Sequence, residues 1–340
     1  MLPHIHILGL SIPMYAAMVV LGAISYLIYY KLVPVRREGI DRVSDNRLVL
    51  VFILGFLSLG VWAFILNSLF HSIEEGRIVV GGITWLGGVI GCIPSVYLLI
   101  HYLVPREKGN AVNRFSTMMP GLVLAHGFGR LGCFFGGCCY GARTDGPLGV
   151  VFPAGSAAGK QYPNTAVEAV VREITHANGT VEKIELYPSL PVLPTQLIEA
   201  LFAFLLFLVM LIFYKRLKHI NVEIYCFAYG IFRFILEFWR GDDRGTTGFA
   251  LSPSQLMSII IIIGATLLIL YKRKIIFTSL YKKCELWSAE ARALPVSNEP
   301  LSLRRESPAD TIRKLHSLMK DGIITKEEFE EKKKELLKKI

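Results

Sequence analysis

The run HGFGRLGCFFGGCCYG at residues 126–141 places two ionisable side chains in an otherwise apolar part of the chain. His126 and Arg130 are four residues apart, so a helix would present them on one face. Guanidinium pairs with phosphate through several donors, and imidazole accepts protons near neutral pH. The pair therefore predicts part of an anion site. The alternative for His126 is a hydrogen-bonded packing residue.

A second set of ionisable residues lies further along the chain. The stretch YGIFRFILEFWR carries Arg233, Glu237 and Arg240 at helical spacing, with Tyr229 four residues before the first. Glu199 lies in the apolar block PTQLIEA. Charged groups inside a membrane are costly and usually mark function. Cations exceed carboxylates in these stretches, so we predict a phospholipid headgroup site; the alternative is a buried Arg–Glu network that fixes helix packing.

The composition indicates that these residues sit in a membrane. The chain has 340 residues, 53% of them hydrophobic, and a mean hydropathy of +0.47. An apolar run of about 18 residues or more predicts a transmembrane helix. The first run lacks a basic leader and a cleavage site, which favours a retained helix. We predict an all-α integral membrane protein with seven transmembrane helices, near 10–30, 48–68, 82–104, 116–135, 194–214, 222–239 and 252–271.

The positive charge predicts the orientation of these helices. The net charge is +10, and the basic residues cluster after the first, third, fifth and seventh runs. Positive loops stay in the cytoplasm, so we expect the N-terminus outside and the C-terminus cytoplasmic. Residues 142–192 would then form an extracytoplasmic insertion. Because the charge follows the helix ends, it does not indicate a nucleic-acid partner.

Two aqueous regions have their own patterns. Within the insertion, two alternating runs flank Asn178-Gly179, which predicts a β-hairpin. Residues 275–308 are a polar linker after the membrane domain of residues 1–274. Residues 309–340 predict a cytoplasmic helical hairpin, the second helix of which begins with the capping pair Thr325 and Glu328. A solvated charged tail is the alternative.

The chain has six cysteines, three of them close together in the opening motif: Cys133, Cys138 and Cys139. The insertion contains no cysteine, so no disulfide framework is predicted there. The three could form a thiol relay or a soft-metal site, but their spacing matches no common zinc pattern. Small buried apolar cysteines are the favoured interpretation, and neither a metal nor a cofactor is predicted.

Several blocks together are similar to one family. GRLGCFFGGCCYG resembles the signature of prolipoprotein diacylglyceryl transferases, and YGIFRFILEFWR resembles their motif in the sixth helix. GGITWLGGVIG, PTQLIEA and SPSQLMS resemble three further blocks. The resemblance covers roughly residues 10–272. Residues 309–340 resemble the short C-terminal domain of many bacterial proteins, which implies an oligomerisation or docking role.

The resemblance implies an activity and a place in the cell. Such enzymes transfer a diacylglyceryl group from phosphatidylglycerol to the thiol of a lipobox cysteine in a prolipoprotein, in the bacterial inner membrane, where the multi-pass chain would serve lipoprotein biosynthesis. Arg130 and Arg233 would bind the phosphate and stabilise the departing glycerol phosphate. The expected catalytic residues are His126, Arg130, Arg233 and Glu237. The expected substrate-binding residues are Tyr15, Arg130, Gly141, Glu199, Tyr229, Arg233 and Arg240.

Three positions depart from the family pattern. Leu86 and Leu193 stand where a histidine is usual, and Cys133 stands where an asparagine is frequent. His126 is then the expected substitute for the base. Three alternative functions follow: a transferase on the same scaffold with another acceptor, a non-catalytic phospholipid-binding or assembly protein, and a membrane thiol redox protein built on the three cysteines.

Overall fold

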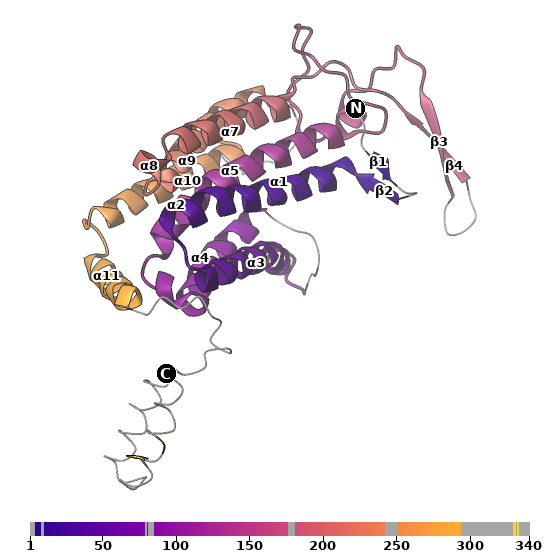
Figure 1. The fold of residues 1–340 in the computed structure, drawn as a ribbon. Coiled ribbons are helices and arrows are strands. Elements are labelled where there is room, and N and C mark those ends of the chain that lie inside the picture. The colour runs from indigo at the N-terminus through magenta and orange to yellow at the C-terminus, as the bar shows by residue number, and fades with distance from the viewer. Residues whose placement is uncertain are drawn as a thin grey trace.

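The computed structural model describes residues 4–7, 10–78, 80, 85–175, 181–241, 251–293, 329, 330 and 332. Long helices dominate these residues (Figure 1). The helices overlapping the predicted apolar runs are α1 (Met14–Tyr30), α3 (Arg42–Glu75), α4 (Trp85–Leu103), α5 (Ala111–Gly136), α7 (Thr195–Ile212), α9 (Asn221–Leu236) and α10 (Pro253–Lys272).

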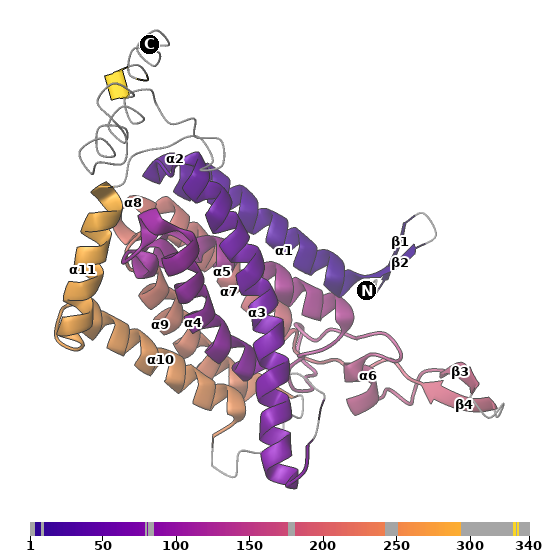
Figure 2. The same cartoon turned by 90° about the horizontal axis from the view of Figure 1, so that it is seen from below.

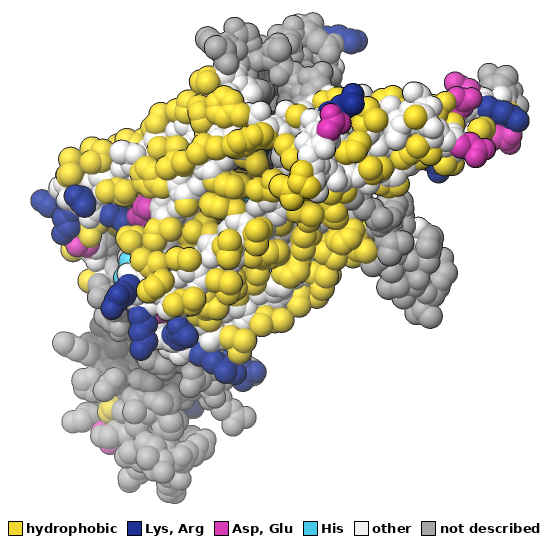
Figure 3. Space-filling view, turned by 90° about the horizontal axis from the view of Figure 1, so that it is seen from above, with side chains coloured by type: hydrophobic (Ala, Val, Ile, Leu, Met, Phe, Trp, Pro, Cys, Tyr) yellow, Lys and Arg dark blue, Asp and Glu magenta, His cyan; other side chains and the backbone are white. Residues whose placement is uncertain are grey.

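Several helices have the character of membrane spans. Four stretches are long and apolar enough to cross a bilayer: Met14–Glu38, Arg42–Leu69, Thr195–Ile212 and Ser254–Lys272. Gly91–Leu103 is a shorter apolar helix. Figure 3 shows hydrophobic side chains over most of the helical face in view, with many Lys and Arg at one end and a few more at the other. The fold is therefore that of an all-α membrane protein, and the number of crossings stays a prediction.

Helix α5 lies at the centre of the bundle and packs against both α1 and α7, while α3 pairs with α4 and α9 with α10 (Figure 2). Small residues permit the close approach of membrane helices. Gly22 of α1 faces Ala125 of α5 so closely that a Cβ on the glycine would lie 3.1 Å from the Ala125 carbonyl oxygen. These contacts bring the polar residues of α5 to face α7 and α9.

Helix boundaries follow local capping signals. Asp41 caps α3 by accepting a hydrogen bond from the Ser44 amide at 3.0 Å. Ser252 and Gln255 form a capping box at the start of α10. Helix α5 ends at Gly137, whose φ of 67° is left-handed and suits glycine.

The two ends of the bundle carry different elements. At one end lie the hairpin of β1 (His4–Ile7) with β2 (Leu10–Pro13) and the antiparallel pair β3 (Val170–Thr175) and β4 (Val181–Leu186) (Figures 1 and 2). The short helix α6 (Ala157–Gln161) lies in the segment before β3. The pair β3–β4 agrees with the predicted hairpin; its Asn178-Gly179 turn lies outside the described residues. The prediction that the first helix begins at residue 10 is wrong, because residues 10–13 pair as β2 and the helix begins at Met14.

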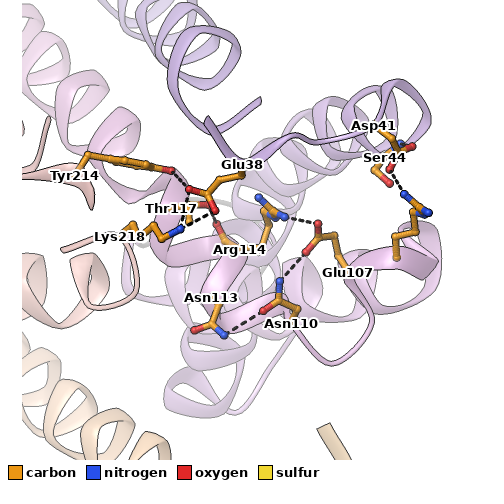
Figure 4. Close-up of polar contacts among 11 residues, drawn as sticks. Glu38, Asp41, Ser44, Glu107, Asn110, Asn113, Arg114, Thr117, Tyr214 and Lys218 are labelled. Carbon is orange, nitrogen blue, oxygen red and sulfur yellow. Dashed lines mark hydrogen bonds and ion pairs between the residues drawn. The ribbon is translucent and has the colours of Figure 1, made fainter. Parts of the chain in front are cut away.

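A network of ion pairs, which we call the end network, closes the opposite end of the bundle (Figure 4). It joins α2 (Arg36–Glu38) to α8 (Tyr214–Leu217), and the turn η2 (Pro105–Glu107) to α5. The π-turn η1 (Lys31–Val35) connects α1 to α2. Glu107 pairs with Arg114, and Glu38 accepts hydrogen bonds from Lys218 at 3.0 and 3.1 Å. The carboxylates at this end thus each have a cation of their own.

Part of the predicted linker is a helix. Residues 278–293 form α11 (Thr278–Ala293), which packs against η2. The Trp287 ring contacts the His101 ring edge-on at 4.7 Å and has Lys108 over its face at 5.3 Å. These aromatic contacts stabilise a polar helix that hydropathy alone does not reveal. Nearly all of the predicted hairpin at 309–340 lies outside the described residues.

Candidate active site

Glu199, in the second turn of α7, is the centre of the candidate site. Its side chain is 0% exposed. One oxygen, Oε1, lies 2.9 Å from Arg130 Nε and accepts a hydrogen bond from the Tyr229 hydroxyl at 2.7 Å. The other oxygen, Oε2, has no hydrogen-bond partner among the described residues. A buried carboxylate in this position holds Arg130 against the junction of α5, α7 and α9.

His126 contacts the same group. Arg130 Nε donates to His126 Nε2 at 3.2 Å, which confirms that the two residues share one helix face. Nδ1 of the ring lies 3.2 Å from the Tyr225 hydroxyl, and the ring packs edge-on against Tyr229 at 5.0 Å. Arg130 Nε carries one hydrogen and lies closer to Glu199 Oε1, at 2.9 Å, than to His126 Nε2, and Nε2 also faces Glu199 Oε1 at 3.6 Å. The imidazole is therefore held between Arg130, Glu199 and Tyr225.

A second ion pair lies on α9 and at the start of α10. Arg233 Nη2 is 2.7 Å from Glu237 Oε2 and donates to the Ser254 hydroxyl at 2.9 Å. Ser252, the N-cap of α10, donates to Glu237 Oε1 at 2.8 Å. Arg233 is only 6% exposed, yet its Nη1 has no hydrogen-bond partner among the described residues. A buried guanidinium nitrogen in this state is suited to an anion.

Arg240 does not lie on the helix face that the spacing predicted. Helix α9 ends at Leu236, Glu237–Trp239 form the 3₁₀ turn η3, and Arg240 is extended. The cause is tertiary: Arg240 pairs with Gly141, and the Ala142 amide donates to the Trp239 carbonyl at 2.9 Å. Backbone pairing overrides the helical continuation that the sequence suggests, and it carries Arg240 toward the end of α5.

Gly141 occupies a crowded backbone junction. Its amide donates to the Leu193 carbonyl at 2.8 Å, and a Cβ here would lie 2.7 Å from the Trp239 carbonyl oxygen. Leu193 returns a bond to Ala142 at 3.0 Å. Gly141 and Leu193 thus close the two ends of the insertion side by side, and glycine is needed for space. The side chain of Leu86 lies outside the described part of the structure.

Tyr15 and the three cysteines lie beside Arg130. Tyr15, in the first turn of α1, is 49% exposed and packs against Gly132. Gly132 lies between Arg130 and Cys133 in α5, so Tyr15 is beside both. The predicted residues therefore gather at one end of the bundle, the end that carries residues 142–192 (Figure 1).

The three cysteines converge although they are not all adjacent in sequence. Their Sγ atoms lie within 4.8 Å of one another, all partly buried and all free thiols. Cys139 has a φ of 62°, a left-handed conformation that costs a non-glycine residue about 1–2 kcal/mol. The first turn of α7 holds this turn in place, because Thr195 Oγ1 donates to the Cys139 carbonyl at 2.9 Å and Gln196 Nε2 to the Cys138 carbonyl at 2.7 Å.

Sequence reasoning missed three residues of this site. Tyr225 stacks on Tyr229 with ring centroids 5.3 Å apart and contacts His126. Its position one turn before Tyr229 was a usable signal. Ser252 and Ser254 bind the second ion pair. The pattern Ser252-x-x-Gln255 is a capping box that could have placed Ser252 at a helix start.

Comparisons with known proteins match two parts of the chain. A family model for prolipoprotein diacylglyceryl transferase matches residues 3–271, and one for the short C-terminal domain matches residues 310–337. The chain is 31% identical over 274 residues to phosphatidylglycerol–prolipoprotein diacylglyceryl transferase 2 of Clostridium perfringens (strain 13 / Type A), covering 77% of this chain and 91% of the relative. It is 29% identical over 260 residues to the corresponding transferase of Clostridium tetani (strain Massachusetts / E88), covering 75% of this chain and 91% of the relative.

Proposed function

The chain belongs to the prolipoprotein diacylglyceryl transferase family, and we propose that it transfers a diacylglyceryl group from phosphatidylglycerol to the thiol of a lipobox cysteine in a prolipoprotein. The reaction forms a carbon–sulfur bond at the glyceryl carbon and breaks the carbon–oxygen bond to phosphate. The bonding electrons pass to the phosphate oxygen, and glycerol phosphate leaves. The thiol proton must be removed, because only thiolate is nucleophilic.

The observation that carries the proposal is the buried Nη1 of Arg233, which lacks a hydrogen-bond partner among the described residues. A phosphate there would supply the acceptor. Glu237 and Ser254 orient this guanidinium, so it meets the leaving group with little reorganisation. Arg130 would contact the same anion from α5, oriented by Glu199 and Tyr229. We propose Tyr15, Gly141 and Arg240 as the lining of the site.

We propose that His126 positions the Arg130 side chain. Its Nε2 accepts a hydrogen bond from Arg130, and this bond must break before the ring accepts a proton from the substrate. His126 then serves as the base only in a state in which Arg130 has turned toward the phosphate. Replacing it with alanine separates the roles: loss of the positioning bond weakens phosphatidylglycerol binding, whereas loss of the base lowers the rate at saturating lipid.

We propose seven membrane crossings with the N-terminus and residues 142–192 outside and the C-terminus in the cytoplasm. The site then opens on the outer side of the inner membrane, where an exported prolipoprotein presents its cysteine. The orientation is supported by the basic residues of the opposite end, among them Lys215, Arg216 and Lys218. The short C-terminal domain would act as a docking or oligomerisation element inside the cell.

A transfer assay tests the function. Purified protein is mixed with phosphatidylglycerol and a lipobox peptide, and thioether-linked diacylglyceryl peptide is measured by mass spectrometry. We expect product from the wild-type chain and none from Arg130→Ala, whereas exposed Arg216→Ala, the matched control, keeps full activity. Product at the wild-type level from Arg130→Ala would remove that residue from the mechanism. No product from a folded wild-type chain that binds the lipid would favour another acceptor or a non-catalytic role.

A further inference from the structure

The three partly buried thiols of Cys133, Cys138 and Cys139, which we call the thiol cluster, have the geometry of a metal site. Thiolate–zinc bonds are about 2.3 Å long, so three sulfurs around one tetrahedral zinc are about 3.8 Å apart. The three Sγ atoms lie within 4.8 Å of one another. Small changes in side-chain torsion would bring them to the required spacing.

Contacts with α7 hold the backbone of the thiol cluster in an uncommon conformation. Cys139 keeps a φ of 62°, which a non-glycine residue retains only where its surroundings impose it. The imposed contacts come from Thr195 and Gln196 of α7, which bind the carbonyls of Cys139 and Cys138 at 2.9 and 2.7 Å. Strained positions of this kind concentrate at functional sites. Packing of three small apolar residues requires no such turn.

The cluster provides three ligands and leaves a fourth position open. Among the described residues, no histidine, aspartate or glutamate joins the three thiols. Structural zinc sites are closed by four protein ligands, whereas catalytic sites have three and keep one position for water or substrate. The cysteines are only partly buried, so an incoming group can reach them.

The cluster lies next to the proposed reaction. Cys133 follows Arg130 by three residues on α5, about one helical turn, and Arg240 pairs with Gly141, two residues after Cys139. The cluster is therefore next to the guanidinium groups proposed to hold the phosphate. A zinc ion with three thiolates carries a net negative charge, and nearby arginines offset it.

We propose that the thiol cluster binds one zinc ion and that the acceptor cysteine of the prolipoprotein occupies the fourth position as a thiolate. The inference rests on the proposed function. Binding to zinc releases the thiol proton to water. The thiolate sulfur then attacks the glyceryl carbon, the carbon–oxygen bond breaks toward phosphate, and the thioether product, a weaker ligand, dissociates. The zinc ion and its three protein thiolates are unchanged, so no oxidant or reductant is needed.

This site supplies a second way to deprotonate the acceptor thiol. Leu86 and Leu193 stand where a base is expected, and His126 contacts both Arg130 and Glu199. A metal that deprotonates the acceptor thiol removes the need for a protein base at this step. The prediction of no metal from the cysteine spacing considered the sequence separation only, whereas the turn at Cys139 brings the sulfurs together.

Metal content is the first test, made on the full chain in detergent. Wild-type protein reconstituted with Zn²⁺ and passed through a desalting column should retain about one zinc ion per chain. The triple variant that combines Cys133→Ser, Cys138→Ser and Cys139→Ser should retain no zinc. The matched control replaces the three cysteines outside the cluster, Cys92, Cys226 and Cys284, by serine, and it should retain zinc as the wild type does. Equal zinc in both triple variants would overturn the proposal.

Cobalt substitution tests the open position without relying on activity. Co²⁺-loaded protein should show the visible absorption of a tetrahedral thiolate site. A lipobox peptide should shift this spectrum, whereas the same peptide with serine in place of cysteine should not. Cys138→Ser alone, a milder change than the triple variant, should lose the thiolate band. A Co²⁺ spectrum that does not change when the cysteine peptide is added would overturn the proposal. So would a site that binds copper in place of zinc and does not respond to the peptide.

Activity separates failure of the site from failure of the proposed function. Removing zinc with a chelator should lower the transfer rate about 10²–10⁴-fold, as loss of an acid–base group does, and added Zn²⁺ should restore it. Full transfer by zinc-free protein would overturn the zinc proposal and leave the transferase function standing. A zinc-loaded chain that binds the cysteine peptide yet forms no thioether would overturn the proposed function and leave the site standing.

Discussion

The ion pairs at the two ends of the bundle differ in how their charges are matched. In the end network, Glu107 pairs with Arg114 and accepts a hydrogen bond from the Asn110 side-chain amide at 3.0 Å, and among the described residues the buried Arg114 nitrogen without a partner is Nε (Figure 4). At the candidate site, Glu199 concentrates its contacts on one oxygen, and a terminal nitrogen of Arg233 is without a partner.

The difference separates a structural from a functional use of the same residue types. A buried charge with a dedicated partner joins two elements, and losing that partner leaves an uncompensated charge. At the candidate site the spare donor is a terminal nitrogen, Nη1 of Arg233, which can be presented to a further anion, whereas the spare nitrogen of Arg114 is the Nε within its side chain. The prediction of an anion site from an excess of cations is thus consistent with the geometry of the second region and not with that of the first.

The largest expected effect is on the stability of the end network. Arg114→Ala leaves the Glu107 carboxylate buried without its cation, and we expect a loss of about 3–5 kcal/mol in the free energy of unfolding. Denaturant unfolding in detergent measures it. The exposed pair of Lys274 and Glu285 is the control, because Lys274→Ala should cost less than about 1 kcal/mol. If Arg114→Ala has the same free energy of unfolding as the wild type, the ion pairs of the end network have no structural role that distinguishes them from those of the candidate site.

At the candidate site the expected effect is on rate. Arg233→Ala should lower the transfer rate about 10²–10³-fold, because one positioned donor to the leaving group is lost. Arg233→Ala also leaves a buried carboxylate, Glu237, with one neutral donor, Ser252, so unfolding is measured alongside the rate. Arg233→Lys keeps the charge without the planar donors and should give an intermediate rate. A rate equal to the wild type in Arg233→Ala would break the comparison.

A moderate effect is expected where the insertion joins the bundle. Gly141→Ala would place a Cβ 2.7 Å from a carbonyl oxygen and 2.8 Å from Leu193 Cβ, so we expect a cost of about 1–3 kcal/mol in unfolding together with reduced activity. Gly264→Ala, which meets nothing within 4 Å, is the matched control and should be neutral or slightly stabilising. Equal melting temperatures for both variants would show that the junction tolerates a side chain.

The smallest expected effect is on the cap of α3 and depends on pH. Asp41→Ala should cost about 1 kcal/mol at neutral pH. Burial raises the pKa of Asp41, but hydrogen bonds from Ser44 and Arg106 outweigh it and lower the pKa below its ordinary 3.8. The stabilisation is therefore present above pH 3.8 and is lost as the pH falls through the folded pKa. Unfolding of variant and wild type should converge in acid; a gap that persists there would contradict this.

Local spacing predicted part of the site, and tertiary contacts decided the rest. The contact between His126 and Arg130 follows from helical spacing alone. Arg240 was misplaced because backbone pairing with Gly141, a residue almost a hundred positions away, ends the helix early. The pairing of Arg130 with Glu199 depends on which helices are neighbours, which hydropathy does not encode.

The thiol cluster and α11 show two further limits. The sulfur spacing depends on a left-handed turn at Cys139 that no residue type announces, since glycine is the usual signal for such a turn. Helix α11 is polar and depends on ring and cation contacts of Trp287 with the rest of the chain. In each case the deciding interaction is distant in sequence and leaves no periodic pattern.

The two ends of the insertion, residues 142–192, are bonded to each other, so the segment is structurally separate from the bundle. Besides the bonds at Gly141, Thr144 donates to the Pro191 carbonyl at 3.0 Å, and Val150 and Val192 exchange two backbone bonds of 2.9 and 3.1 Å. These backbone bonds therefore fix the two ends of the segment against the bundle independently of the outer hairpin. Changes to the length or sequence of β3 and β4 are therefore expected to leave α5 and α7 in place. An epitope or a fluorescent reporter grafted at the hairpin would leave the chemistry at its base undisturbed.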